Sequence, residues 1–119
     1  MPKRTLCPLI LFAVLSLPAT RWVRLHYDLK SNPGMGDAGL YYYYHLFAKA
    51  LDALGEDDFT AADGVRHDWR AELLVRLAER QQPDGSWLNT NDRWLEGDAN
   101  LVTGYALLAL SYCKSSASN

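Results

Sequence analysis

The chain carries the stretch Arg80-Gln81-Gln82-Pro83-Asp84-Gly85-Ser86-Trp87, in which a helix is expected to end, turn and deliver a tryptophan. The amide of Gln81 can donate to carbonyls that a helix leaves without partners in its last turn. Pro83 cannot continue the helix, and Asp84-Gly85 supplies a turn that accepts a positive φ. The ring of Trp87 can then fill a gap between helices. Gln81, Asp84, Gly85 and Trp87 therefore form a predicted structural motif.

Hydrophobic periodicity predicts helices on both sides of this turn. They are expected over residues 20–29, 40–54, 69–81 and 99–113. Gly55 suits the end of the second helix, and Asp68 and Asp98 suit the N-caps of the third and fourth. The second and fourth helices are apolar on almost every side, so both are predicted to be buried. The first and third each have one polar face.

The third helix has a sharper pattern than the others. Trp69, Leu73, Leu74 and Leu77 form its predicted buried stripe, and an ion pair between Glu72 and Arg76 is expected outside. Before this helix, residues 56–66 are interpreted as a loop that can hold a small hairpin. Its arms would be Phe59-Thr60 and Val65-Arg66, joined by Asp63-Gly64.

The composition is that of an ordinary globular domain. The 119 residues are 49% hydrophobic and 22% charged, and the net charge of −2 gives no indication of a nucleic-acid or anionic-membrane partner. Seven tyrosines and four tryptophans favour a cavity or aromatic packing. The two cysteines, Cys7 and Cys113, predict no disulfide framework.

The two ends of the chain differ from the rest. Lys3-Arg4 and the apolar run over residues 6–17 are typical of a signal peptide, too short for a membrane span. Residues 1–19 are therefore predicted to be a signal peptide or a spurious start. The protein is exported, to the periplasm or the medium, if that signal is genuine, and cytoplasmic otherwise. Residues 115–119 are predicted to be a disordered tail.

The two apolar helices also echo each other. Leu40-x3-Tyr44-x-Leu46-x-Ala48 has the same spacing as Leu101-x3-Tyr105-x-Leu107-x-Ala109. Repetition of this kind is typical of stacked helical hairpins. Together with the turn over residues 80–87, it resembles the prenyltransferase/squalene-oxidase repeat family, which includes squalene–hopene cyclases. The resemblance rests on residues 33–45, 73–87 and 101–110, and it extends over residues 20–114.

The resemblance implies an all-α fold in which outer helices wrap inner helices around a central cavity. This chain would form a partial α/α toroid of two helical hairpins with alternating outer and inner helices. Two hairpins leave apolar faces exposed, so the partners expected are missing upstream repeats or a second copy of the chain. An apolar or isoprenoid ligand in the cavity is the small-molecule partner that the resemblance implies.

The sequence lacks the catalytic and metal-binding motifs of that family. The Asp-x-Asp-Asp acid of the cyclases is absent, and Asn100 stands where the prenyltransferases have a zinc-binding cysteine. No histidine follows Asp98 to complete a zinc site. We therefore predict no catalytic residue, no metal and no cofactor. The predicted function is a fragment that serves as a non-catalytic binding or scaffold protein. The alternative is part of a terpenoid-cyclase or prenyltransferase type of enzyme, inactive alone.

Some aromatic and polar residues are candidates for lining the cavity. A run of tyrosines followed by a histidine could bind an apolar ligand or stabilise a cation. Plain packing of the rings and a hydrogen-bonded structural histidine are the alternatives. A second group lies before the fourth helix, where the mouth of a cavity is expected. The candidates are Tyr41, Tyr43, Tyr44, His45, Trp94 and Asp98.

Overall fold

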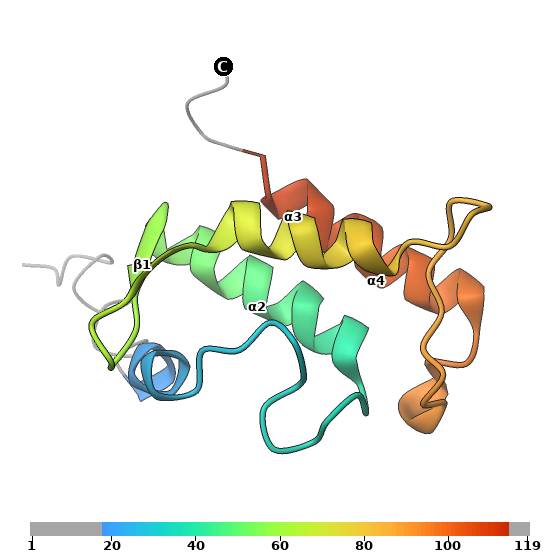
Figure 1. The fold of residues 1–119 in the computed structure, drawn as a ribbon, viewed down its shortest axis with the longest axis horizontal. Coiled ribbons are helices and arrows are strands. Elements are labelled where there is room, and N and C mark those ends of the chain that lie inside the picture. Colours follow the sequence, from blue (N-terminus) through green and yellow to red (C-terminus); the bar gives the residue numbers. More distant parts are fainter. Residues whose placement is uncertain (1–17, 115–119) are drawn as a thin grey trace, which may run out of the picture.

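The computed structural model describes residues 18–114, with three long helices running side by side (Figure 1). The predictions for residues 1–17 and 115–119 lie outside the described residues. A helix over residues 18–25 leads into an irregular segment. The later elements are α2 (Leu40–Leu54), β1 (Asp58–Thr60), β2 (Arg66–Asp68), α3 (Trp69–Arg80), the short 3-10 helix η1 (Arg93–Leu95) and α4 (Ala99–Tyr112).

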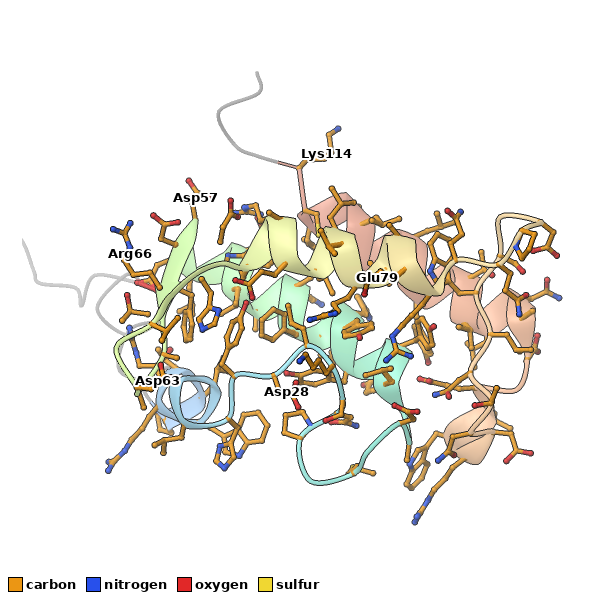
Figure 2. All side chains as sticks on the ribbon, in the orientation of Figure 1. Asp28, Asp57, Asp63, Arg66, Glu79 and Lys114 are labelled. Atoms are coloured by element: carbon orange, nitrogen blue, oxygen red, sulfur yellow. The ribbon has the colours of Figure 1, made fainter. Side chains whose placement is uncertain are left out.

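The prediction of an all-α fold is wrong, because β1 and β2 form a two-stranded antiparallel sheet. The fold is mixed α/β, and this finding replaces the predicted partial α/α toroid. The hairpin forms because Phe59 is fully buried while its neighbours in β1 face solvent. Gly64 turns the chain with a φ of 84°. Arg66 pairs with Asp58 across the strands, and Asp57, Asp63 and Arg66 gather at this end of the molecule (Figure 2).

The predicted ends of the long helices are confirmed to within one residue. Gly55 ends α2 with a φ of 76°. The carboxylate of Asp68 accepts from the N–H of Ala71 at 3.2 Å and caps α3. The first helix is the exception, since it stops at residue 25 instead of residue 29.

The core lies where α2 packs lengthwise against α4. Its fully buried side chains include Leu40, Tyr44, Leu51, Trp69, Leu73, Leu77, Val102, Ala106 and Ala109. The prediction that α2 and α4 are buried is wrong for part of each helix. Tyr42 and Leu46 of α2 are 47% and 42% exposed, and Leu107 and Leu108 of α4 are 56% and 45% exposed. Leu74 is also exposed, although it was expected in the buried stripe of α3. Large apolar side chains therefore stay exposed on α2, α3 and α4.

The turn after α3 has the contacts that its sequence suggests. The Gln81 amide donates to the carbonyl of Gly85 at 2.9 Å, and Gly85 has a φ of 90°. The carboxylate of Asp84 accepts from the N–H and the hydroxyl of Ser86. Trp87 is 3% exposed, and its indole N–H donates to the carbonyl of Leu77 at 2.9 Å. The turn therefore folds back and closes on α3.

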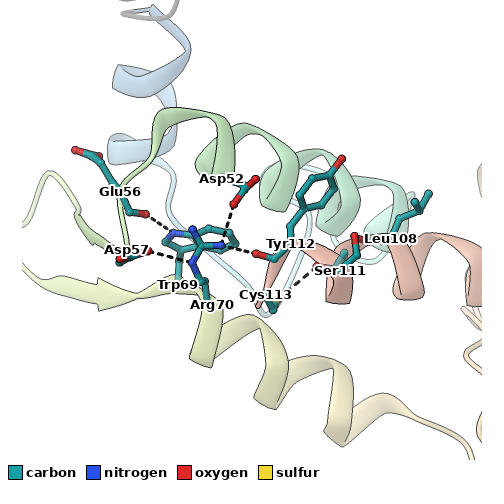
Figure 3. Close-up of polar contacts among 10 residues, drawn as sticks. Asp52, Glu56, Asp57, Trp69, Arg70, Leu108, Ser111, Tyr112 and Cys113 are labelled. Atoms are coloured by element: carbon teal, nitrogen blue, oxygen red, sulfur yellow. Dashed lines mark hydrogen bonds and ion pairs between the residues drawn. The ribbon is translucent and has the colours of Figure 1, made fainter. Parts of the chain in front are cut away.

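Arg70 connects the ends of three elements (Figure 3). Its guanidinium reaches Asp52 near the end of α2 at 3.1 Å and Asp57 before β1 at 3.3 Å. It also donates to the carbonyl of Tyr112 at the end of α4, where a cation is favourable for the helix dipole. The guanidinium lies over the ring of Trp69, 4.4 Å from its centroid. This residue therefore joins α3 to α2, α4 and the hairpin.

Beside this cluster, Cys113 is expected to react slowly with thiol reagents. Burial raises the pKa of its thiol to about 11, against a partial opposing effect of Arg70. Because only the thiolate attacks, at pH 8 we expect it to react about 100-fold more slowly than an exposed cysteine. The measurement is reaction with a chromogenic disulfide in a Cys7→Ser background, before and after denaturation in urea. A rate in the folded protein equal to that in urea would contradict the burial of the thiol.

Candidate functional site

Tyr41, Tyr43 and Tyr44 of α2, which were expected to line a cavity, pack in the core or bond to the neighbouring segment. Tyr41 and Tyr44 are 2% and 0% exposed. The hydroxyl of Tyr43 donates to the carbonyl of Asp28 at 2.8 Å, and that of Tyr44 donates to the carbonyl of Leu29 at 2.6 Å. Burial raises the pKa of Tyr44 to about 12, so the hydroxyl remains a donor at neutral pH. These contacts hold the segment that follows the first helix against α2.

His45 lies on the side of α2 that faces α4. Its ring is roughly parallel to those of Tyr105 and Tyr112, with centroids 6.1 and 6.3 Å away. Its Nδ1 is buried and has no hydrogen-bond partner among the described residues. Burial, with a smaller contribution from Lys49, lowers the pKa of the imidazole. His45 is therefore neutral at pH 7 and packed between aromatic rings.

Trp94 and Asp98 flank a strained loop before α4. Asp98 is exposed and caps α4 by accepting from the N–H of Asn100 at 2.9 Å. Trp94 has a φ of 63° and Leu95 a φ of 67°, a left-handed conformation that costs about 1–2 kcal/mol for each such residue. Both side chains are exposed, Trp94 by 58% and Leu95 by 75%. Strain of this kind persists only where the surrounding structure enforces it.

The buried carboxylate of Glu96 enforces the position of this loop. It is 0% exposed and accepts from the backbone N–H groups of Tyr41 at 3.1 Å and Tyr42 at 2.8 Å. These groups lie in the first turn of α2, which has no side-chain cap of its own. The amide of Asn89 donates to the same carboxylate at 2.9 Å and to the carbonyl of Asp37 at 2.6 Å. The same carboxylate of Glu96 therefore caps α2 and ties the loop over residues 89–96 to the start of that helix.

An aromatic pocket lies between this loop and the start of α2. Its volume is about 360 Å3, and its lining is Asn32, Met35, Gly39, Tyr42, Trp94 and Tyr105. The rings of Tyr42 and Tyr105 meet edge to face, with centroids 5.4 Å apart. A side chain at Gly39 would place its Cβ 3.3 Å from the ring of Trp94, so glycine leaves the pocket open. No lining residue is an acid, a histidine or a cation.

The structure brings only Trp94 from the predicted cavity residues into this pocket. Tyr41, Tyr43 and Tyr44 serve the core and the loop, His45 lies between helices, and Asp98 is a helix cap. Sequence reasoning missed Tyr42 and Met35 as lining residues, and Glu96 and Asn89 as their support. Tyr42 lies within the predicted tyrosine run, but its partners come from other elements, and no local spacing signals them.

Comparisons with known proteins leave the chain without relatives to guide its function. No protein family, no curated protein and no solved structure matches it. The resemblance to the prenyltransferase/squalene-oxidase repeat family therefore stays a prediction. Within residues 18–114, no helix has the length and apolar character needed to cross a membrane. Over the same residues, no group of three or more histidines, cysteines or acids is placed to hold a metal ion.

Proposed function

We propose that this chain is a binding module that holds a small apolar molecule in the pocket of Tyr42, Trp94 and Tyr105. The observation that carries the proposal is the exposed ring of Trp94, held in a strained conformation beside a preformed aromatic pocket. A tryptophan exposed without a ligand gives up the free energy of burial, and a ligand in the pocket would recover it. Isoprenoid alcohols belong to the class of ligand that these walls suit.

Support also comes from the way the pocket is built. Its volume of about 360 Å3 lies within the range of small-molecule sites, which are mostly apolar with few polar groups. The polar groups here are the hydroxyls of Tyr42 and Tyr105 and the amide of Asn32, which already donates to the carbonyl of Ala38 at 2.8 Å. Glu96 fixes the loop before a ligand arrives, which reduces the ordering that binding requires.

The lining favours binding over chemistry at this pocket. Proton-initiated cyclisation requires a strong acid aimed into the cavity, and prenyl transfer requires a metal or another group that stabilises the leaving diphosphate. The lining side chains offer amide, thioether, indole and phenol groups, and none of them is a carboxylic acid, a histidine or a cation. The guanidinium of Arg93 lies over the ring of Trp94, 5.0 Å from its centroid, and Arg93 does not line the pocket. A non-catalytic binding role is therefore the function we propose for this pocket.

Trp94→Ala is expected to weaken binding of farnesol, used as an apolar probe, about tenfold or more. The ring supplies the largest apolar surface of the pocket, and burial of one such side chain is worth about 1.5–3 kcal/mol. Affinity is measured by titration calorimetry and by quenching of tryptophan fluorescence. The unfolding midpoint should stay unchanged, because the ring is exposed.

Trp22→Ala is the matched control, since Trp22 is also an exposed tryptophan, 44% accessible, but lies on the first helix. Its affinity for farnesol should equal that of the unaltered chain. Geraniol and decanol would test whether the pocket distinguishes isoprenoids from straight chains. Equal losses in both tryptophan variants, or no binding of any apolar probe, would contradict the proposal.

A further inference from the structure

A second cavity opens on another part of the molecule, between the segment after the first helix and α3. Its volume is about 430 Å3, and it shares no lining residue with the aromatic pocket. Three elements contribute to it: the segment over residues 27–30, β2 and α3. The lining residues are Tyr27, Asp28, Leu29, Lys30, His67, Ala71, Glu72, Val75 and Arg76. The expected ion pair between Glu72 and Arg76 is absent here, and Arg76 pairs with Glu79 instead.

At this cavity Glu72 holds a histidine and a tyrosine. The carboxylate oxygens of Glu72 lie 3.0 and 3.1 Å from Nδ1 of His67. One of them also accepts from the hydroxyl of Tyr27 at 2.8 Å. The rings of Tyr27 and His67 stack with their centroids 3.8 Å apart. Burial and the bond to Glu72 raise the pKa of Tyr27, so this hydroxyl stays protonated. The imidazole of His67 is therefore held by Tyr27 against one face of its ring and by Glu72 at Nδ1.

This arrangement decides which nitrogen of His67 is free. A carboxylate only accepts hydrogen bonds, so Nδ1 carries the proton that points to Glu72. In the neutral ring Nε2 then has a lone pair. The His67 side chain is 19% exposed and lines the cavity, and among the described residues its Nε2 forms no hydrogen bond. An imidazole with an orienting carboxylate at one nitrogen and a free lone pair at the other has the arrangement of a general base.

One of the two cations that line the cavity, Lys30, has no acidic partner among the described residues. The carboxylate of Asp28 already accepts from the N–H of Lys30 and the hydroxyl of Ser31, both at 2.7 Å. The carboxylate of Glu72 is occupied by Tyr27 and His67. Within the described part of the chain the ammonium of Lys30 forms no ion pair, and Arg76 lines the cavity as a second cation. Lys30 therefore offers a positive charge to a ligand, whereas Arg76 is already paired with Glu79.

We propose that this cavity is a general-base site that hydrolyses small esters carrying a negative charge. Nε2 of His67 takes a proton from water as the water oxygen bonds to the acyl carbon. The bond from that carbon to the alcohol oxygen then breaks, and the proton passes from Nε2 to the departing alkoxide. The products are the acid and the alcohol. Glu72 stabilises the imidazolium between the two transfers, and Lys30 attracts the anionic ester.

The test uses the full chain and two chromogenic probes, neutral 4-nitrophenyl acetate and the anionic mono-4-nitrophenyl ester of succinic acid. Hydrolysis above the buffer rate is expected, with the anionic ester preferred. His67→Ala should lower kcat about 100-fold or more, as expected for loss of a general base. His67→Gln, whose amide can still donate to Glu72, should lose the activity and keep the fold. His26→Ala is the control, because His26 is exposed and lies outside the cavity lining.

Two further variants separate positioning from structure. Glu72→Gln should lower kcat about tenfold and leave KM unchanged, because it acts through His67. Lys30→Ala should raise KM for the anionic ester and not for the neutral one. Equal rates for the His67 and His26 variants, no preference for the anionic ester, or no hydrolysis above buffer would each overturn the proposal. None of these outcomes bears on farnesol binding at the aromatic pocket.

Discussion

Replacing Glu96 by alanine is expected to lower the free energy of unfolding by about 3–5 kcal/mol. The carboxylate is fully buried and accepts from two backbone N–H groups of α2 and from the amide of Asn89. Without it, the buried donors of Tyr41 and Asn89 and the partly buried N–H of Tyr42 lose this acceptor, and each buried group left unsatisfied costs about 1–3 kcal/mol. The strained loop of Trp94 and Leu95 also loses what holds it. The loss is therefore larger than that of an ordinary helix cap.

The measurement is equilibrium unfolding in urea, followed by circular dichroism. Glu96→Gln should cost about 1.5–3 kcal/mol, because one oxygen remains and the other acceptor becomes a donor that faces N–H groups. Glu79→Ala is the control, since Glu79 is exposed and pairs only with Arg76 across one turn of α3, so its loss should cost less than about 0.5 kcal/mol. Equal midpoints for the Glu96 and Glu79 variants would show that the buried network contributes little.

The contacts of Glu96 could not be predicted from the sequence, whereas those of two other helix caps could. Asp68 and Asp98 are predicted as caps because an aspartate directly before a helix can bond to an N–H two or three residues later. Both bonds are present in the structure. Glu96 caps a helix that begins more than 50 residues earlier, so no local spacing indicates the contact. Glu72 is a second case, because it contacts His67 and Tyr27 instead of its expected partner Arg76. Tyr27 lies 45 residues earlier in the chain, so no local spacing indicates that contact.

Burial was harder to predict than the helices themselves. Gly55 and Pro83 end α2 and α3 through local chemistry, so these boundaries were readable. The apolar composition of α4 was taken to mean burial on every side, yet Leu107 and Leu108 are exposed. Composition shows how much apolar surface a helix has, whereas neighbouring elements decide how much of it is covered. A small hairpin before α3 was expected, but the fold was still predicted to be all-α, and the sheet of β1 and β2 makes it mixed α/β.

Trp87→Ala is expected to destabilise the protein by about 3–5 kcal/mol, the usual cost of removing a buried aromatic ring. The ring is 3% exposed and belongs to the core cluster with Leu73, Leu77 and Ala106. Its indole N–H donates to the carbonyl of Leu77, one of the last four carbonyls of α3 that a helix leaves without an internal partner. The residue therefore fills the core and caps the helix that its own turn ends.

Unfolding in urea would separate these two roles. Trp87→Phe keeps a six-membered aromatic ring but removes the indole donor and part of the buried surface, so a loss of about 1–2 kcal/mol, smaller than that of Trp87→Ala, would show that the retained ring stabilises the core. Trp94→Ala is the matched control, because it removes the same side chain from an exposed position and should change stability by less than about 0.5 kcal/mol. A Trp87→Ala variant as stable as Trp94→Ala would mean that the turn ending at Trp87 does not anchor α3. A full loss already in Trp87→Phe would place the stabilisation in the hydrogen bond and not in the packing of the ring.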